Sequence, residues 1–197
     1  MRYLAIVAVL LSGCVGGVPA GISRYDLVQA ASPSVRHPDL LLRSVEVRAP
    51  SWLDSPAMQY RLAYTLDSRR EAYAQSRWLA PPAALLERAL QHRLLADASG
   101  TQAAGCRLFV ELGEFVQVFD APGASRSVLE IRATLSAPRG GMLLARRAFS
   151  QSPPAGPDAR GSAAAFSVAT AMLGDDLLAW LAGLARDTPE VTSRCRN

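Results

Sequence analysis

Lysine is missing from the sequence, and histidine and cysteine are rare, with two and three residues in a chain of 197. All 21 basic residues are therefore arginine, which we attribute to codon bias. They are scattered, and only Arg69-Arg70 and Arg146-Arg147 are adjacent. No basic run alternates with aromatic residues, so we expect no nucleic-acid partner. The net charge of +4 leaves a weak preference for anionic partners or lipid head groups open.

Groups that could support catalysis are few and poorly placed. His37 lies in a loop with prolines and His92 on the polar side of a predicted helix, so both are interpreted as surface residues. No Gly-x-Ser-x-Gly motif, metal-ligand spacing or phosphate-binding loop is present. Asp175 and Asp176 are adjacent on a predicted helix, where neighbouring side chains point about 100° apart and do not converge on one atom. The sequence therefore predicts no enzyme, no metal and no cofactor.

The first 14 residues have the pattern of a bacterial lipoprotein signal. Arg2 precedes an apolar run over residues 3–11, which suits a signal peptide and is too short to span a bilayer. Leu11-Ser12-Gly13-Cys14 then matches the lipobox, in which small residues admit the peptidase and the cysteine thiol receives diacylglycerol. The alternative is an ordinary secretory signal in which Cys14 has no role.

On the lipoprotein interpretation, residues 1–13 are removed and Cys14 anchors the mature chain to a membrane. One acyl chain holds a protein only marginally, so we expect further acylation, such as palmitate. Residues 14–23 are a flexible tether that reaches at most about 30 Å. Val15, in place of aspartate, favours the periplasmic face of the outer membrane. No later segment is predicted to span a membrane, because the most apolar one, residues 163–184, contains two adjacent carboxylates.

Cys106 and Cys195 remain once Cys14 is lipidated. An even pair of cysteines in an exported protein favours a disulfide in the oxidising periplasm. It would close a loop of about 90 residues and attach the C-terminal tail to the start of a strand. The alternative is two separate free thiols.

Residues 24–197 are predicted to form one domain of the α+β class, an antiparallel sheet with two main helices packed on it. Alternating and β-branched runs predict strands over residues 24–29, 40–47, 59–66, 70–78, 107–119, 128–136 and 142–151. The last three are joined by Gly- and Pro-containing turns and are predicted to form an antiparallel meander.

Two amphipathic helices complete the predicted domain. The first covers residues 83–98 after Pro81-Pro82, because proline suits the first turn of a helix. Its apolar residues recur every four positions at Leu86, Leu90 and Leu94. The second covers residues 159–185, where 3-4 spacing gives one apolar stripe and Gly174 is interpreted as a bend.

The strand over residues 107–119 is predicted to be central, because both of its faces are apolar or aromatic. Strict alternation places one set of residues on one face: Leu108, Val110, Leu112, Val116 and Val118. It places a second set on the other: Phe109, Glu111, Phe115, Gln117 and Phe119. The aromatic face either packs under a helix or is an exposed edge that meets lipid or a partner. Trp78, before the first helix, and Trp52, in a loop after Pro50, are likewise candidate contact residues.

The order and spacing of several segments resemble the ABC-type transport auxiliary lipoproteins, a family that includes the paraquat-inducible intermembrane transport lipoprotein. Beyond the lipobox, the matching segments are Tyr25-Asp26-Leu27, residues 42–47 with Pro50 and Leu53, residues 73–78 before Pro81-Pro82, residues 108–112 and 114–119, and residues 178–181. The Arg-Trp pair followed by proline and the Glu-Phe-x-Gln-x-Phe strand are the most specific of these. One departure is Leu79-Ala80, where the family pattern is more polar.

The resemblance implies an α/β domain in which two helices pack on an antiparallel sheet. It implies a role at the outer membrane, where the protein docks or receives an MCE-domain (mammalian cell entry) protein that shuttles lipid and works with an ABC permease and ATPase. A homo-oligomer is left open. The alternative function is a periplasmic lipoprotein that binds a lipid or another ligand outside an ABC system.

Overall fold

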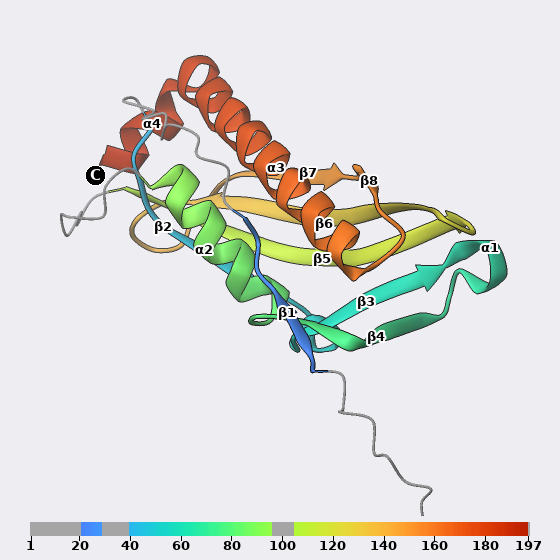
Figure 1. The fold of residues 1–197 in the computed structure, drawn as a ribbon. Helices are drawn as coiled ribbons and strands as arrows, with labels where there is room; N and C mark the ends of the chain where they lie inside the picture. Colours follow the sequence, from blue (N-terminus) through green and yellow to red (C-terminus); the bar gives the residue numbers. More distant parts are fainter. Residues whose placement is uncertain (1–20, 29–39, 96–104, 197) are drawn as a thin grey trace, which may run out of the picture.

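The computed structural model describes residues 21–28, 40–95 and 105–196, so Cys14 and His37 lie outside the described residues. The chain forms one sheet with two long helices on one of its faces (Figure 1). The predicted fold class, an α+β domain with two main helices, is confirmed. The sheet is mixed, because β1 runs parallel to β4, and both β2 and β3 run parallel to β5.

The strands and helices of the described residues have the following bounds. The strands are β1 (Ser23–Tyr25), β2 (Leu42–Arg48), β3 (Ala57–Leu62), β4 (Arg70–Trp78), β5 (Cys106–Ala121), β6 (Ala124–Ser136), β7 (Leu143–Gln151) and β8 (Pro154–Ala155). The helices are the 3₁₀ turn η2 (Ser51–Leu53), α1 (Ala63–Leu66), α2 (Pro82–Leu94), α3 (Ala159–Asp187) and α4 (Pro189–Arg196).

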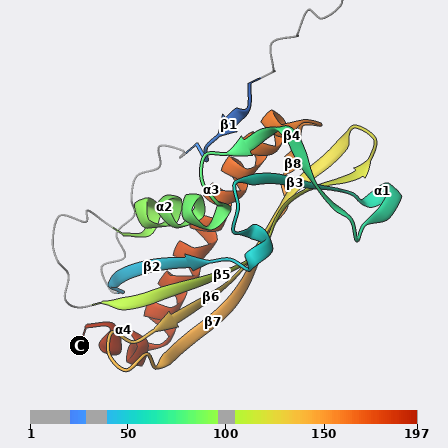
Figure 2. The ribbon, with the colours of Figure 1, turned by 90° about the horizontal axis from the view of Figure 1, so that it is seen from below.

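The antiparallel hairpin of β5 and β6 forms the centre of the sheet. One edge of β5 pairs with β2 along its first half and with β3 further on. The far edge of β6 pairs with β7 and, nearer the hairpin turn, with β8. The predicted meander of β5, β6 and β7 is therefore confirmed, and Figure 2 shows these strands side by side beneath α3.

A β-bulge at Gly113 divides β5 into two halves that face opposite ways. Leu112 pairs with Ile131 and Glu114 with Glu130, so β5 advances two residues where β6 advances one. The extra residue reverses the alternation. The single-face assignment from sequence is therefore wrong. Even-numbered residues up to Leu112 lie on the helix side, but beyond the bulge the odd-numbered residues do, and Phe109 lies on the face opposite Phe115.

The helices α2 and α3 cover the same face of the sheet and contact each other (Figures 1 and 2). Leu86 and Leu90 of α2 are fully buried, as is Leu173 of α3. α3 has the length and apolar composition of a membrane span, but its apolar stripe packs on the sheet. At Gly174, where a bend was predicted, α3 packs closely on α2: a Cβ there would lie 3.1 Å from Cγ of Arg93.

The three residues after β1 form a strap that connects the two helices. Asp26 forms an ion pair with Arg88 of α2 at 2.6 Å. The backbone N–H of Val28 donates to Oγ of Ser167 in α3 at 3.0 Å. Leu27, between them, is 4% exposed and belongs to the core. The segment nearest the expected tether is thus fixed to the domain by contacts to both helices.

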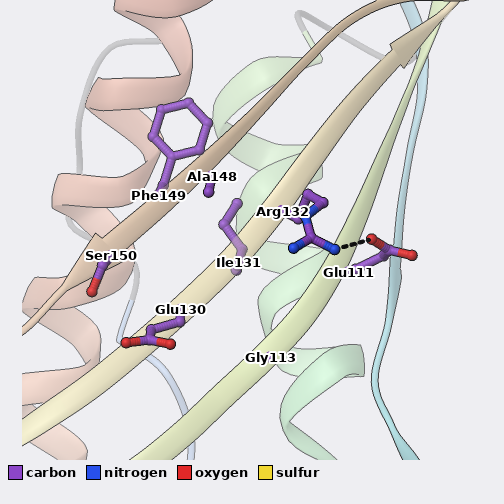
Figure 3. A pocket seen from close by; sticks show the side chains of 8 residues that line it. All are labelled: Glu111, Gly113, Glu130, Ile131, Arg132, Ala148, Phe149 and Ser150. Atoms are coloured by element: carbon purple, nitrogen blue, oxygen red, sulfur yellow. Dashed lines mark ion pairs between the residues drawn. The ribbon is translucent and has the colours of Figure 1, made fainter.

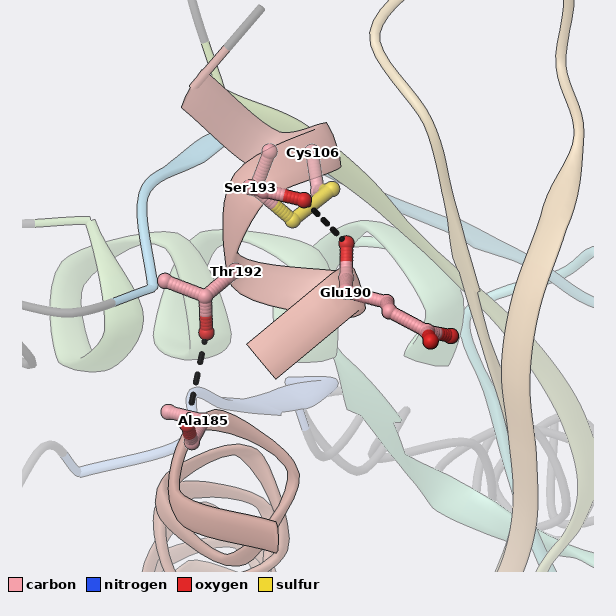
Figure 4. Close-up of a disulfide and its surroundings, with 6 residues drawn as sticks. Cys106, Ala185, Glu190, Thr192 and Ser193 are labelled. Carbon is pink, nitrogen blue, oxygen red and sulfur yellow. Dashed lines mark hydrogen bonds between the residues drawn. A yellow bond between two sulfur atoms is a disulfide. The ribbon is translucent and has the colours of Figure 1, made fainter. Parts of the chain in front are cut away.

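Among the differences from the sequence prediction, three change how the elements are connected. The strand predicted over residues 59–66 ends at Leu62, because the chain turns through α1 to bring β4 antiparallel to β3. The predicted loop over residues 152–157 contains the two-residue strand β8. The tail after α3 forms α4, whose Cys195 joins Cys106 in a disulfide (Figure 4).

Candidate functional site

The aromatic residues of the second half of β5 are buried on the helix side of the sheet. The Phe115 ring stacks on that of Phe166 with centroids 3.8 Å apart, and Trp78 packs edge-on against both rings at 5.3 and 5.6 Å. Phe115 and Trp78 are each 2% exposed, and Phe119 is also buried. In this structure these three contact candidates are buried: Phe115 and Trp78 pack against Phe166 of α3, and Phe119 packs edge-on against Tyr60.

Gln117, the fourth candidate, lies at the centre of a buried hydrogen-bond network. Its Oε1 accepts from the Tyr73 hydroxyl at 2.7 Å. Its Nε2 donates to Oγ of Ser125 at 2.7 Å and to the carbonyl oxygen of Gly156 at 2.8 Å. Because Gln117 is fully buried, each of these partners offsets the cost of removing a polar group from water. The network joins β4, β5, β6 and the segment before α3.

Burial raises the pKa of the Tyr73 hydroxyl from 10.0 to about 12, with a further contribution from the negative charge of Asp158 and a smaller one from Tyr60. The folded protein therefore keeps a proton that the unfolded chain releases near pH 10. The stabilisation is fully present below pH 10 and is lost as pH rises through the folded pKa near 12.

We expect Tyr73→Phe to have two measurable effects. At neutral pH it should lower the free energy of unfolding by about 1–2 kcal/mol, because Oε1 of Gln117 loses its donor. Between pH 10 and 12 it should make stability fall less steeply than in the wild type. Denaturant unfolding at pH 8 and pH 11 measures both. Equal slopes with pH in the two proteins would contradict the assignment of the alkaline loss to Tyr73.

Trp52, the fifth candidate, is exposed. It lies in η2, between β2 and β3, with 56% of its surface accessible. The next residue, Leu53, is 1% exposed and fixes the turn to the core. Nε2 of Gln59 donates to the backbone carbonyl of Trp52 at 2.7 Å. The indole of Trp52 is therefore exposed on a turn whose backbone is fixed by the buried Leu53 and by the hydrogen bond from Gln59.

The face of the sheet opposite the helices is charged along the first half of β5. Arg132 of β6 lies 3.8 Å from Glu111 of β5. Arg48 of β2 lies 5.2 Å from the centroid of the Phe109 ring and forms an ion pair with Glu46. We call this surface the open face. Its alternating charges contrast with the apolar side under the helices.

A hollow of about 430 Å³ lies on the open face where β5 bulges. Figure 3 shows Glu111, Arg132 and Glu130 around it, with Gly113 on β5 and Ser150 on β7. Glycine at the bulge leaves the backbone without a side chain to fill this space. Charged side chains line it together with the apolar residues Ile131 and Phe149, so it suits a molecule that has both polar and apolar parts.

A second charged cluster lies next to the hollow, beyond the bulge. Glu114 accepts from Nη2 of Arg70 at 2.6 Å and from Nη2 of Arg61 at 2.9 Å. Nη1 of Arg70 donates at 3.1 Å to Gln59, the residue that also holds Trp52. The cluster therefore connects β3, β4 and β5 to the exposed turn. These residues were not predicted from the sequence, although glycine inside a strand often indicates a bulge, and Glu114 directly follows Gly113.

The remaining sequence candidates do not form a catalytic arrangement. His92 is exposed on α2. Asp175 pairs with Arg93, whereas Asp176 accepts from Nε2 of Gln151 at 2.6 Å, so the two carboxylates have different partners. Among the described residues no group of three or more histidine, cysteine, aspartate or glutamate side chains is placed to hold a metal ion.

The chain was compared with known proteins. A crystal structure of a protein from Xanthomonas campestris has a TM-score of 0.66 at 19% sequence identity and covers 86% of this chain and 97% of its own. The crystal structure of an uncharacterized protein gives 0.54 at 18% identity, over 85% and 98%. At these identities the likeness shows the fold alone. None of the curated proteins matches the chain. The model of one family matches residues 25–177, and the chain belongs to that family, the ABC-type transport auxiliary lipoprotein component.

Proposed function

We propose that this protein is the lipoprotein component of an MCE-type ABC intermembrane lipid transport system, and that it docks the periplasmic lipid-shuttling protein at the outer membrane. Membership of the family associates the chain with a transport system and with membrane-anchored proteins of the cell envelope. The family is one of transport auxiliary lipoproteins and not an enzyme class. The MCE partner, its permease and ATPase, and the outer-membrane location are the parts we propose.

The observation that carries the proposal is the family match across nearly the whole domain. The open face supports it, because it carries both positive and negative side chains beside the exposed Trp52. Tryptophan and arginine are the residues that most often dominate protein–protein binding energy. We therefore propose Trp52, with Arg61 and Arg70 next to it, as the contact for the shuttling protein.

We also propose that Cys14 carries the lipid after removal of residues 1–13, and that residues 14–23 tether the domain. The support is the sequence Leu11-Ser12-Gly13-Cys14 after an apolar run, together with a family of lipoproteins. The domain side of the tether is well fixed, because Asp26 and Val28 bond to α2 and α3. The absence of aspartate after Cys14 supports the outer membrane.

Burial of the aromatic residues weakens the alternative of a lipid-binding lipoprotein outside an ABC system. It was motivated by an apolar second face on the central strand. In the described residues that face is divided by the bulge at Gly113, Phe115 stacks on Phe166 of α3, and Phe119 is buried against Tyr60. The hollow on the open face is lined by charged and small residues together with Ile131 and Phe149.

The proposal is tested by a pull-down from detergent-solubilised membranes with the tagged lipoprotein as bait. We expect an MCE-domain protein with its permease and ATPase. Trp52→Ala should weaken capture roughly 30-fold, the loss expected for a tryptophan hot spot. Met172→Ala is the matched control, because Met172 is a similarly exposed apolar residue on the outer side of α3 and should change capture less than about twofold.

Two outcomes would contradict the proposal. Recovery of an unrelated outer-membrane complex, or of no protein, would remove the transport role. Full function of a Cys14→Ser chain, which cannot be lipidated, would show that the anchor is not needed for docking.

A further inference from the structure

One end of the molecule collects arginines that form no ion pair with any other described residue. The start of β2, the start of β5, the turn between β6 and β7, and α4 meet there. Leu42 pairs with Cys106, Arg107 pairs with Ser136, and the disulfide joins Cys106 to α4 (Figure 4). We call this end the basic pole, and its exposed arginines are Arg43, Arg107, Arg139, Arg186, Arg194 and Arg196.

These six arginines differ from most others in the domain. Within the described ranges none of them forms an ion pair, whereas eight arginines elsewhere do. The exposed carboxylates of the described residues at this end are Asp187 and Glu190. The pole therefore has a local positive excess that the modest net charge of the whole chain conceals.

Two apolar side chains project among these arginines. Met142 is 43% exposed and Leu143 is 52% exposed, at the turn between β6 and β7. The turn is closed by the N–H of Ala137, which donates to the carbonyl of Met142 at 2.9 Å, and by Gly140 and Gly141 at φ of 71° and 63°. Nη1 of Arg194 lies 3.7 Å from the sulfur of Met142. Met142 and Leu143 therefore lie on a turn closed by a hydrogen bond, with the guanidinium of Arg194 beside Met142.

We propose that the basic pole binds anionic phospholipid head groups at a bilayer surface, with Met142 and Leu143 entering the boundary between head groups and acyl chains. A guanidinium matches phosphate geometry, and an apolar tip with a basic rim matches the interfacial zone. An acidic protein surface would satisfy the arginines but would leave the apolar pair without a complement. A lipoprotein is held beside a bilayer, which raises the local concentration of this surface.

This inference goes beyond the transport role, because it assigns the surface that meets lipid and not the protein partner. Its test uses the mature chain with Cys14→Ser, exported to the periplasm so that the disulfide forms. The described domain has its own core and disulfide, and removal of the lipid leaves every described contact in place. The probes are vesicles of phosphatidylcholine alone and vesicles with an equal amount of phosphatidylglycerol, and binding is measured by co-sedimentation.

The expected result is binding to the mixed vesicles that weakens as salt is added, with little binding to phosphatidylcholine alone. The pair Arg139→Gln and Arg196→Gln should weaken binding roughly 30-fold. The pair Arg24→Gln and Arg160→Gln is the control: both residues are exposed, lie away from the pole, and change the net charge equally, so the loss should be under about threefold. Met142→Ser with Leu143→Ser should weaken binding while leaving its salt dependence.

The proposal is overturned if the unmodified chain shows no preference for the anionic vesicles, or if both arginine pairs weaken binding equally. Unchanged thermal unfolding of the variants, whose altered side chains are all exposed, shows that any loss is one of binding. Failure of the pull-down would contradict the transport proposal but not this inference. Failure to bind anionic vesicles would contradict this inference but not the transport proposal.

Discussion

Replacing Cys106 and Cys195 together with alanine should lower the free energy of unfolding by about 4–5 kcal/mol. The two residues are 89 positions apart, and closing so long a loop restricts the unfolded chain strongly. Both side chains are fully buried, so their truncation also removes packing at the start of β5. Such a loss is a large part of the stability of an ordinary domain. Denaturant unfolding of the two proteins under oxidising conditions measures it.

Without the disulfide, α4 should be the first element to unfold, because few other contacts attach it to the rest of the domain. Figure 4 shows the hydroxyl of Thr192 donating to the carbonyl of Ala185 at 3.4 Å, and Val191 supplies a buried side chain. Hydrogen exchange in α4 should therefore accelerate more than in β5 or α3. The control is a reductant, which should destabilise the wild type to a similar extent and leave the alanine variant unchanged. A difference below about 1 kcal/mol would contradict a structural role for the disulfide.

Local patterns were sufficient to predict most elements of the fold. The strand of residues 70–78 was predicted with the same bounds as β4, and α2 and α3 were found from apolar spacing with boundaries within a few residues. These predictions depend on periodicity and on proline at a helix start, which act over a few residues. The parallel pairs of β2 and β3 with β5 were not predicted, because pairing between distant strands depends on packing that no local pattern contains.

The faces of β5 show where strict alternation fails. Gly113 interrupts the strand in sequence, and glycine inside a strand often indicates a bulge. Treating the strand as regular placed Phe109 with Phe115, whereas one extra residue reverses every side chain beyond it. Whether the aromatic face was core or interface could not be decided from the strand alone, because the answer depends on α3, which follows much later in the chain.

The candidate contact surface was predicted only in part. Trp52 was proposed from its place in a loop, and the structure leaves it exposed. The cluster of Arg61, Arg70 and Glu114 was not found, because its members come from three strands and meet only when β3 pairs with both β4 and β5. The same holds for the basic pole, whose arginines are scattered in sequence and are brought together by the fold.

A substitution that adds one carbon atom, Gly161→Ala, should destabilise the domain by about 3 kcal/mol. Gly161 lies in the first turn of α3 and packs against Gly156, which precedes the helix. A Cβ on Gly161 would lie 2.4 Å from Cα of Gly156 and 2.7 Å from its nitrogen, both of which are backbone atoms. The backbone must therefore move, and with it the carbonyl of Gly156 that accepts from Gln117. Alanine is otherwise the better helix former, so the expected sign is opposite to that of helix propensity.

The same helix supplies the control. A Cβ on Gly183 would meet only a carboxylate oxygen of Asp187 at 4.0 Å, so Gly183→Ala should stabilise the domain by about 0.5–1 kcal/mol. At Gly174 the nearest atoms belong to the flexible side chain of Arg93, so alanine there should fall between the two. Thermal unfolding of the three variants tests this order. Stabilisation by Gly161→Ala would mean that α3 does not begin in close contact with Gly156, and the position of the helix over Gln117 would have to be revised.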